Sequence, residues 1–276
     1  MSGFDFPGFS TILQSLKPDM SEEPTASLQA KCDQLSRALA DRSAQLENAT
    51  REFEQFAYSV SHDLRAPLRA VEGFAQILSE DYGETLDEDG KRCIRILVSG
   101  ARKASLLLED LLTHFRISRN PFRSDVVNMN ELVAQKIREL GEVAGKAEIR
   151  VGNLPNAWGD PKWLGIAIDH LLRNAIKFSR GHTKPVIEVD GKSEPRATVY
   201  QFCDNGVGFD VKYADRLFGI FQRLHGEEEF EGRGIGLAIV MKVLRRHGGN
   251  AWAEGKIGQG ATFYISVPTR EAASVE

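Results

Sequence analysis

Residues 28–64 read LQAKCDQLSRALADRSAQLENATREFEQFAYSVSHDL, and apolar or small side chains recur along this stretch at alternating spacings of four and three. The alternation covers positions 28, 32, 35, 39, 42, 46, 49, 53, 56 and 60, among which only Arg42 is neither apolar nor small. A four-three repeat gathers these side chains on one side of a helix, as in the seam of a coiled coil. The stretch therefore predicts a long helix that packs against a partner through this seam.

The repeat slips by one residue at its end. The next seam position would be Asp63, yet the apolar residue is Leu64, after which positions 67, 71, 74 and 78 resume the pattern. The spacing of eleven from Phe53 to Leu64 locally unwinds a left-handed supercoil. Pro67 has no backbone N–H and is predicted to kink the helix. We therefore expect a disturbed helix around His62.

A second periodic segment follows the polar stretch Ser79 to Asp89, with apolar positions at 94, 97, 101, 104, 108, 111 and 115. Two such helices joined by a short loop form a helical hairpin, which leaves apolar stripes in water. Pairing of two hairpins into a four-helix bundle would bury the stripes, so we expect a homodimer. The alternative is that the stripes pack on the rest of the chain.

The pattern changes to mixed elements after Pro121. A helix opens with Asp160 as its N-cap and Pro161 at its first position. Other helices are expected from about Asn130 and over residues 235–246, with strands at 148–151, 186–189, 197–203, near Ala251 and at 262–267. Because helices and strands do not alternate regularly, an α+β sandwich is favoured over a doubly wound parallel sheet.

Composition narrows the function classes. A length of 276 residues predicts about two domains, and 42% hydrophobic with 27% charged residues is typical of a globular protein. The net charge of −4 disfavours binding to nucleic acid. The sequence has no apolar run near ~18 residues, and its amino terminus has no basic segment followed by an apolar one, so we expect no membrane span and a cytoplasmic location. The scattered cysteines Cys32, Cys93 and Cys203 suggest neither disulfides nor a zinc site.

His62 is the first candidate for chemistry. It lies two residues past Val60, about 200° around the helix, and is predicted to face solvent. A neutral imidazole can act as a nucleophile through one nitrogen while Asp63 accepts the proton of the other. The alternative is an ordinary surface pair without a chemical role.

Polar side chains also gather on one flank of the helix that begins after Asp160. His170, Asn174 and Lys177 stand there at i, i+4 and i+7. An amide oxygen suits Mg²⁺ and an ammonium suits a phosphate, so this flank could hold a metal and a nucleotide's phosphates. The alternative is a solvated helix face.

Three glycine clusters follow. Asp204, at a strand end before Gly206 and Gly208, could accept a hydrogen bond from an exocyclic amine. The segment Gly232-Arg233-Gly234-Ile235-Gly236 opens a helix, where free N–H groups favour an anion. Because no strand leads into this segment, the hypothesis of a dinucleotide-binding motif is not supported. The third cluster, Gly258 to Phe263, leads into the last strand, and each cluster alone could be a turn.

Taken in order, these clusters resemble the histidine protein kinases of two-component signalling over about residues 50–268. The segment around His62 resembles their H box, and the later clusters resemble the N, G1, F, G2 and further glycine boxes of the GHKL-type ATP-binding domain. The segments Phe221 to His225 and His247 to Trp252 are similar to the kinase modules of bacterial phytochromes and related cytoplasmic sensors.

The resemblance implies an ATP-dependent protein-histidine autokinase that phosphorylates His62 and transfers the phosphoryl group to an aspartate of a response regulator. It implies ATP and Mg²⁺ as cofactors. It assigns roles residue by residue: His62 as phosphoacceptor, Asp63 as its activator, Asn174 as Mg²⁺ ligand, Lys177 as phosphate contact, Asp204 as adenine contact, Gly206 and Gly208 beside the base, Phe218 and Phe221 flanking a lid over residues 222–233, Gly232, Gly234 and Gly236 near the phosphates, and Thr262 at the adenine end.

The expected fold is therefore α+β and multi-domain, with a helical hairpin that forms a dimeric four-helix bundle before a GHKL-type α/β sandwich that binds ATP. The expected parts are a flexible tail (1–25), a coiled-coil signalling helix (26–50), the dimerisation and phosphoacceptor hairpin (51–120), the catalytic ATP-binding domain (121–268) and a C-terminal tail (269–276). The alternative for the first tail is a short docking segment from Phe4 to Leu16.

Three positions depart from the family's pattern. Ala66 stands where many of these kinases carry Thr or Asn to position a water, so phosphatase activity is not favoured. His170 stands where Asn is common. Arg233 replaces a common Thr or Ser and is predicted to reach a phosphate.

Two other functions remain open, a kinase-inactive scaffold or phosphotransfer dimer and another GHKL ATPase. Asn174, Lys177 and Asp204 argue against the first, and His62 argues against the second. Beside a second copy, the expected partners are a response regulator receiver domain and an input source. Because only about 50 residues precede the hairpin, input is expected from a separate sensor protein, from the tail and coiled coil, or from a domain outside this chain. A signal that shifted the seam would be felt at the heptad slip.

Overall fold

The computed structural model describes residues 23–224, 226 and 229–273. The predicted N-terminal tail up to residue 22, with its docking alternative around Phe4, and residues 274–276 lie outside the described residues. The chain divides into two compact units, Met1–Ala57 and Tyr58–Glu276.

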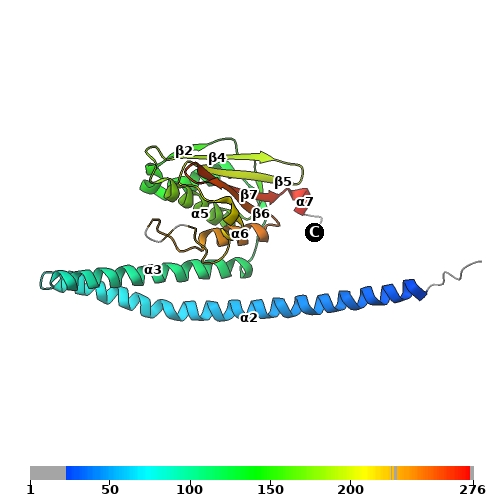
Figure 1. Ribbon diagram of the computed structural model, residues 1–276, viewed down its shortest axis with the longest axis horizontal. Coiled ribbons are helices and arrows are strands. Elements are labelled where there is room, and N and C mark those ends of the chain that lie inside the picture. Colours follow the sequence, from blue (N-terminus) through cyan, green and yellow to red (C-terminus); the bar gives the residue numbers. More distant parts are fainter. Residues whose placement is uncertain (1–22, 225, 227–228, 274–276) are drawn as a thin grey trace, which may run out of the picture. The chain divides into compact units, whose positions relative to one another are not determined.

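The described part of the first unit is helical. It is the beginning of α2 (Glu23–Tyr82), a single helix of 60 residues that continues into the second unit (Figure 1). Seam side chains such as Leu39 and Leu46, both 70% exposed, lie open along it. The predicted long helix is confirmed, and its exposed stripe needs a partner to leave water.

The second unit begins with a helical hairpin. The last part of α2 runs antiparallel to α3 (Glu88–Arg119), whose N-cap Asp87 accepts a hydrogen bond from the Gly90 N–H. Glu72 and Arg102 join the two helices through an ion pair of 3.3 Å. Pro67 lies inside α2 without ending it, so the expected disturbance does not break the helix.

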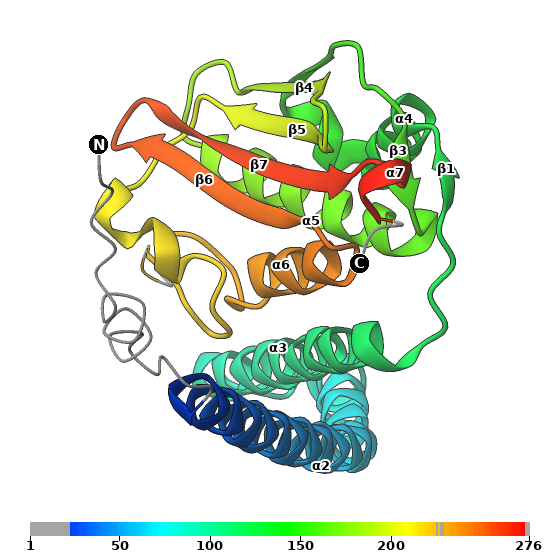
Figure 2. The ribbon, with the colours of Figure 1, turned by 90° about the vertical axis from the view of Figure 1, so that its right-hand side faces the viewer.

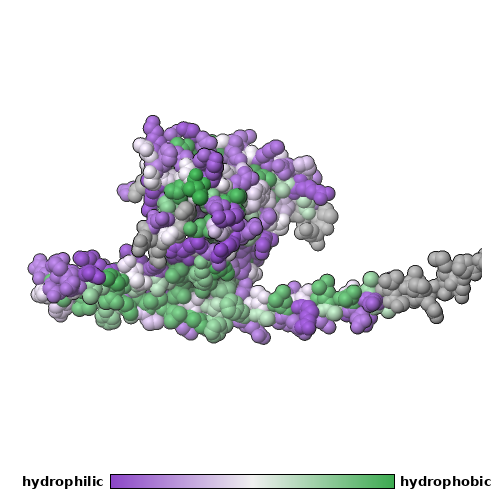
Figure 3. Space-filling view, viewed as in Figure 1, coloured by the Kyte–Doolittle hydropathy of each residue, from purple (hydrophilic) through white to green (hydrophobic). Residues whose placement is uncertain are grey.

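The hairpin buries only part of its apolar surface. Ala75, Ile94 and Ala101 are buried, whereas Phe74 is 68% exposed and Leu97 is 52% exposed. Figure 3 shows apolar side chains gathered over this part of the molecule. The hairpin therefore has a second apolar face that its own chain leaves uncovered.

A five-stranded sheet forms the rest of the second unit, in the order β2-β4-β5-β7-β6. Its strands are β2 (Glu148–Val151), β4 (Val186–Ser193), β5 (Ala197–Asp204), β6 (Asn250–Lys256) and β7 (Gly260–Pro268). Strands β2 and β4 are parallel, and the other neighbours are antiparallel. This confirms the α+β sandwich and excludes a doubly wound parallel sheet.

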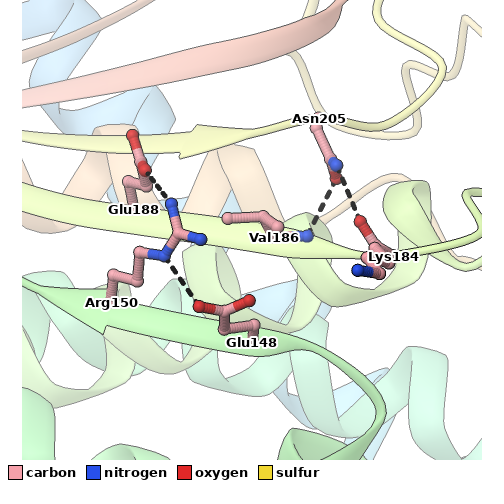
Figure 4. Close-up of polar contacts among 6 residues, drawn as sticks. All are labelled: Glu148, Arg150, Lys184, Val186, Glu188 and Asn205. Atoms are coloured by element: carbon pink, nitrogen blue, oxygen red, sulfur yellow. Dashed lines mark hydrogen bonds and ion pairs between the residues drawn. The ribbon is translucent and has the colours of Figure 1, made fainter.

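Three helices lie on one side of this sheet, α4 (Met129–Leu140), α5 (Pro161–Ser179) and α6 (Gly236–Arg246) (Figure 2). Alternate strand residues such as Tyr200, Phe202 and Ile265 point toward the helices and are fully buried. The opposite face carries polar side chains, among them Arg150, which pairs with Glu148 and Glu188 at 2.9 Å each (Figure 4). The core is therefore the layer between sheet and helices.

Five short elements were not predicted. They are β1 (Asp125–Val127), which pairs with β3 (Ala157–Gly159), the 3₁₀ helices η1 (Gly141–Lys146) and η2 (Val211–Arg216), and α7 (Arg270–Ala273) within the expected C-terminal tail. Segments of three to six residues are too short to show a period, so only their tertiary contacts define them.

Tyr200 offers a test of this core, because its hydroxyl donates a 2.6 Å hydrogen bond to the Pro155 carbonyl from a fully buried position. We expect Tyr200→Phe to lower the free energy of unfolding by about 1–3 kcal/mol, since a buried carbonyl loses its donor. Urea unfolding followed by tryptophan fluorescence would measure this, because all three tryptophans lie in the sheet domain. Tyr264→Phe, at an exposed hydroxyl, is the matched control, and equal losses in both variants would contradict the assignment.

Candidate functional site

His62 lies on the exposed side of α2. Its side chain is 65% exposed and that of Asp63 is 76% exposed, while the preceding Ser61 is buried. The His62 Nδ1 atom lies 3.2 Å from Asp63 Oδ1. The predicted exposure is confirmed. In the tautomer that carries its proton on Nδ1, the ring would donate to Asp63 and the Nε2 lone pair would be free.

Helix α5 carries the polar flank. Asp160 accepts hydrogen bonds from the N–H groups of Lys162 and Trp163 and so fixes the start of the helix, as predicted. Its apolar side is buried in the core, which leaves Asn174 and Lys177 half-buried at the edge. Among the described residues, none forms a hydrogen bond with the Asn174 side chain, so its amide oxygen is open to a ligand.

Lys177 and His170 differ in what their surroundings do to them. Burial, helped by the positive charges of Arg223 and Arg180, lowers the pKa of Lys177 to about 8. The ammonium is therefore still largely charged at pH 7 and poorly hydrated, a state that favours an anionic ligand. Burial lowers the pKa of His170 to about 4, so its imidazole is neutral.

His170 packs beneath the start of α6. A Cβ added at Gly236 would lie 3.0 Å from its Nδ1 atom. Gly236 therefore admits the imidazole, which gives this member of the polar flank a packing role.

Asp204 is the last residue of β5 and is only 3% exposed. Its Oδ1 atom accepts the Gly206 N–H at 2.9 Å, whereas its Oδ2 atom is buried with no hydrogen-bond partner. Burial raises the pKa of this carboxyl to about 6, against hydrogen bonds from Gly206 and Ala261 that lower it. A buried acceptor without a donor is costly, so this atom fits a ligand that brings an N–H group, such as an exocyclic amine.

The glycines after Asp204 serve the chain's own packing. A Cβ at Gly206 would lie 2.4 Å from the Phe178 carbonyl oxygen, and one at Gly208 would lie 2.0 Å from that of Lys256. Gly208 also has a φ of +63°. The loop can pass between the end of α5 and the β6–β7 hairpin only because these side chains are missing.

Asn205 is a residue that the sequence reasoning did not single out. Its Oδ1 atom accepts the Val186 N–H at 2.9 Å, and its Nδ2 atom donates to the Lys184 carbonyl at 2.8 Å (Figure 4). These bonds fasten the loop after β5 to the start of β4 and hold Asp204 in place. Its position directly after the strand-end Asp204 is the signal that could have found it.

The segment Gly232 to Gly236 at the start of α6, here called the glycine loop, lies against Lys177. A Cβ at Gly232 would lie 3.0 Å from the Lys177 Nζ atom, and Gly234 has a φ of +70°. The N-cap residue Ile235 has no side-chain cap, so the first N–H groups of α6 are open to an anion. The Lys177 ammonium therefore lies beside the glycine loop that leads into the start of this helix.

Arg233 of the glycine loop forms an ion pair. Its Nε atom lies 2.8 Å from Asp110 Oδ2 on α3. The Arg233 charge is therefore paired with Asp110 in this structure, and the predicted contact with a phosphate would require Arg233 to leave this ion pair.

The predicted place of Thr262, at the adenine end of the nucleotide, needs a correction. It pairs with Cys203 in the β5–β7 ladder, whereas Ala261 pairs with Asp204. Because side chains alternate between the faces of a sheet, Thr262 lies on the outer face, away from the Asp204 carboxylate. The register of β7 against β5 decides which of Ala261 and Thr262 faces the Asp204 side of the sheet, and the glycine cluster alone could not reveal this register.

The two lid phenylalanines differ. Phe218 is partly buried against the core, whereas Phe221 is 60% exposed with a φ of +60°. Within the described part of the lid, Phe230 contacts Phe178 with ring centroids 5.0 Å apart. Phe230 therefore lies next to the end of α5, where Lys177 stands.

Two family models match the chain. Residues 54–120 match the His Kinase A (phospho-acceptor) domain, and residues 159–271 match the histidine kinase-, DNA gyrase B-, and HSP90-like ATPase domain. The chain belongs to the histidine kinases. This kinase module has its exposed His62–Asp63 pair in the first domain and its orphaned Asp204 oxygen in the second.

Curated relatives support the assignment of the kinase module. Phytochrome-like protein Cph1 of Synechocystis sp. is 37% identical over 233 residues, which cover 83% of this chain and 31% of the relative. The methanogenesis regulatory histidine kinase FilI of Methanothrix harundinacea is 31% identical over 235 residues, covering 84% and 26%. The chain thus spans about a third or less of the length of these relatives.

A solved structure shows the same fold. The crystal structure of full-length ShkA in complex with AMPPNP superposes with a TM-score of 0.60 at 23% identity, covering 78% of this chain and 45% of that chain. Histidine kinases typically form dimers and signal to response regulators. Among the described residues of the kinase module, no helix has the length and apolar character to span a membrane.

We expect Asp204→Asn to stabilise the kinase module above pH 6 by on the order of 2 kcal/mol, because it removes a buried charge. The folded-state pKa of about 6 lies above the ordinary 3.8, so this group costs the wild type stability as the pH rises from about 4 to about 6. Urea titrations at about pH 4.5 and about pH 8 should show the larger difference at the higher pH. Asp215→Asn, at an exposed carboxyl, is the control, and a pH-independent difference would contradict the raised pKa.

Proposed function

We propose that the chain is an ATP-dependent protein-histidine autokinase that phosphorylates His62 and passes the phosphoryl group to an aspartate of a response regulator. The observation that carries the proposal is the exposed His62, whose Nδ1 atom contacts Asp63 at 3.2 Å. A second domain of the same chain supplies an open amide, a half-buried ammonium and an orphaned buried carboxylate oxygen. Such a set serves phosphoryl transfer from a purine nucleotide to the imidazole.

Each polar group of the second domain would hold one part of the nucleotide. The Asp204 Oδ2 atom would accept the adenine amine, and Lys177 with the open N–H groups of α6 would receive the phosphates. The Asn174 amide oxygen would bind Mg²⁺. The described residues hold no group of three or more His, Cys, Asp or Glu that could bind a metal, so phosphate oxygens and water would complete its shell. When bound, Mg²⁺ supplies charge neutralisation of the phosphates.

The imidazole of His62 would do the covalent work. With its proton directed from Nδ1 to Asp63, the Nε2 lone pair is free to attack the γ-phosphorus. The N–P bond forms as the bond from phosphorus to the bridging oxygen breaks, and ADP carries that electron pair away. The Nδ1 proton then passes to Asp63, which stabilises the charged ring while the bond forms.

The proposal includes the partners. The exposed seam of α2 and the uncovered face of the hairpin support a homodimer in a four-helix bundle. The phosphoryl acceptor would be a receiver domain, and the input would come through α2 from a separate sensor or from a domain outside this chain. Since ATP and receiver domains are cytoplasmic, this function would place the chain in the cytoplasm. Ala66 offers no group to hold a water, so phosphatase activity is not part of the proposal.

Incubation with Mg-ATP labelled on the γ-phosphate should give an acid-labile, alkali-stable label on the chain. His62→Gln should abolish the label while nucleotide binding persists. We expect Asp63→Asn to slow labelling by about 10²-fold, because the imidazole loses its proton acceptor. A label that survives in His62→Gln, or an acid-stable one, would contradict the proposal.

The homodimer can be tested at Phe74, which is 68% exposed on the hairpin. We expect Phe74→Asp to raise the dimer dissociation constant at least ten-fold, because an interface would have to bury the new charge. Analytical ultracentrifugation would measure this, with Gln76→Asp on the same helix as control. Equal dissociation constants for the two variants would contradict an interface at this face.

A further inference from the structure

The ion pair between Arg233 and Asp110 joins the glycine loop of the ATP-binding domain to α3 of the hairpin. The Nε atom lies 2.8 Å from the Asp110 Oδ2 atom. The two side chains are only 28% and 16% exposed, whereas both partners of the Arg150–Glu188 pair on the sheet are 55% exposed. The contact is therefore among the more enclosed ion pairs of the described residues.

Enclosure makes each partner depend on the other. Burial raises the pKa of the Asp110 carboxyl, and the Arg233 charge opposes that rise. Removal of one partner from such a pair leaves an uncompensated charge away from water, which costs far more than loss of a surface pair. The pair should therefore hold the loop against α3 rather than form and break freely.

Hairpin geometry places this contact at the level of His62. Glu72 and Arg102 lie opposite each other, joined by their ion pair. His62 is ten residues from Glu72 and Asp110 is eight residues from Arg102, both toward the open end of the hairpin. At 1.5 Å per residue these are about 15 Å and about 12 Å, so the two residues differ in height by about 3 Å.

The same face of the ATP-binding domain continues along α3. The Lys242 ammonium lies 5.7 Å from the centre of the Phe115 ring, and the Arg246 guanidinium donates to the Asn120 carbonyl. Helix α6 thus runs along α3 (Figure 2). Arg233, which belongs to the glycine loop before α6, makes the first contact of this row, at Asp110.

We propose that Asp110 is a positioning residue for the phosphorylation of His62: it holds Arg233, and through it the glycine loop, at the height of the imidazole. The inference rests on the proposed function. It replaces the predicted phosphate contact of Arg233 with a docking role, in which the loop keeps its place on α3 while nucleotide is bound. The competing arrangement is a phosphate that draws Arg233 away from Asp110.

Kinetics separate docking from nucleotide binding. We expect Asp110→Asn and Arg233→Gln each to lower the kcat of His62 labelling about ten-fold and to leave the KM for ATP within about two-fold of its wild-type value. The loop would lie in the wrong place relative to His62 but would still bind nucleotide. The charge-exchanged variant Asp110→Arg/Arg233→Asp should recover most of the rate. Glu188→Gln, which breaks the exposed Arg150 pair, is the matched control and should change neither constant.

The kinetic outcomes that overturn the proposal are distinct. An unchanged kcat in Asp110→Asn would remove the positioning role. A faster rate would make the pair an inhibitory contact, and a KM raised only in Arg233→Gln would return Arg233 to a phosphate. A failure of the charge-exchanged variant to recover any rate would show that the pair itself is not what matters.

A cross-link tests the contact without reference to activity. In a chain whose Cys32, Cys93 and Cys203 are replaced by Ser, Asp110→Cys and Arg233→Cys should be joined by a short thiol-reactive cross-linker. The yield should persist with AMPPNP and Mg²⁺ present, and its loss on adding the analogue would overturn the docking role. If the wild-type chain binds nucleotide but never labels His62, the proposed function fails, whereas the cross-link still reports whether the glycine loop lies against α3 at position 110.

Discussion

The carboxylate of Asp160 is the constraint on which the second domain depends. It caps α5 through the Lys162 and Trp163 N–H groups and accepts the Arg123 N–H of the segment that follows α3. The Asp160 N–H in turn donates to the His247 Nε2 atom at the end of α6. Burial lowers the pKa of His247, so its neutral ring accepts at Nε2 while Nδ1 contacts the Val243 carbonyl. One buried residue thereby sets the positions of α5 and α6, whose far ends bring Lys177 next to the glycine loop.

Two other carboxylates, those of Asp110 and Asp204, are both enclosed but differ in whether their oxygens have partners. Asp110 is enclosed with a guanidinium, so its charge is compensated and the pair holds two parts of the fold together. Asp204 is enclosed with backbone donors on one oxygen only, and the other oxygen is left without a partner. A folded domain tolerates that cost where a ligand is to provide the missing donor. Burial therefore leaves one carboxylate in an ion pair and the other with an oxygen that a ligand's donor could reach.

Regular patterns carried most of the fold prediction. The four-three spacing found both long helices, and Asp160 with Pro161 found the start of α5, because these signals lie within a few residues of one another. The three-residue strands β1 and β3 were not predicted, since their pairing joins segments far apart in the chain. Thr262 was misplaced by one residue of register, which transfers a side chain to the other face of the sheet. The resemblance placed Gly206 and Gly208 beside a base, and the structure adds that backbone atoms of the chain itself lie close to where their side chains would be.

From its amino acids alone, the chain could be recognised as a helical hairpin followed by an ATP-binding sandwich, with His62 exposed beside Asp63. The hairpin and the exposed His62 follow from local spacing and from neighbours on one helix, which hold in any context that keeps the helix, whereas ATP binding was implied by the resemblance to histidine kinases. The orphaned Asp204 oxygen, the lowered pKa values of Lys177 and His170 and the pairing of Arg233 with Asp110 could not be read in this way. Each of them depends on how much water long-range packing removes and which distant charge it brings close, and these quantities exist only once the chain has folded.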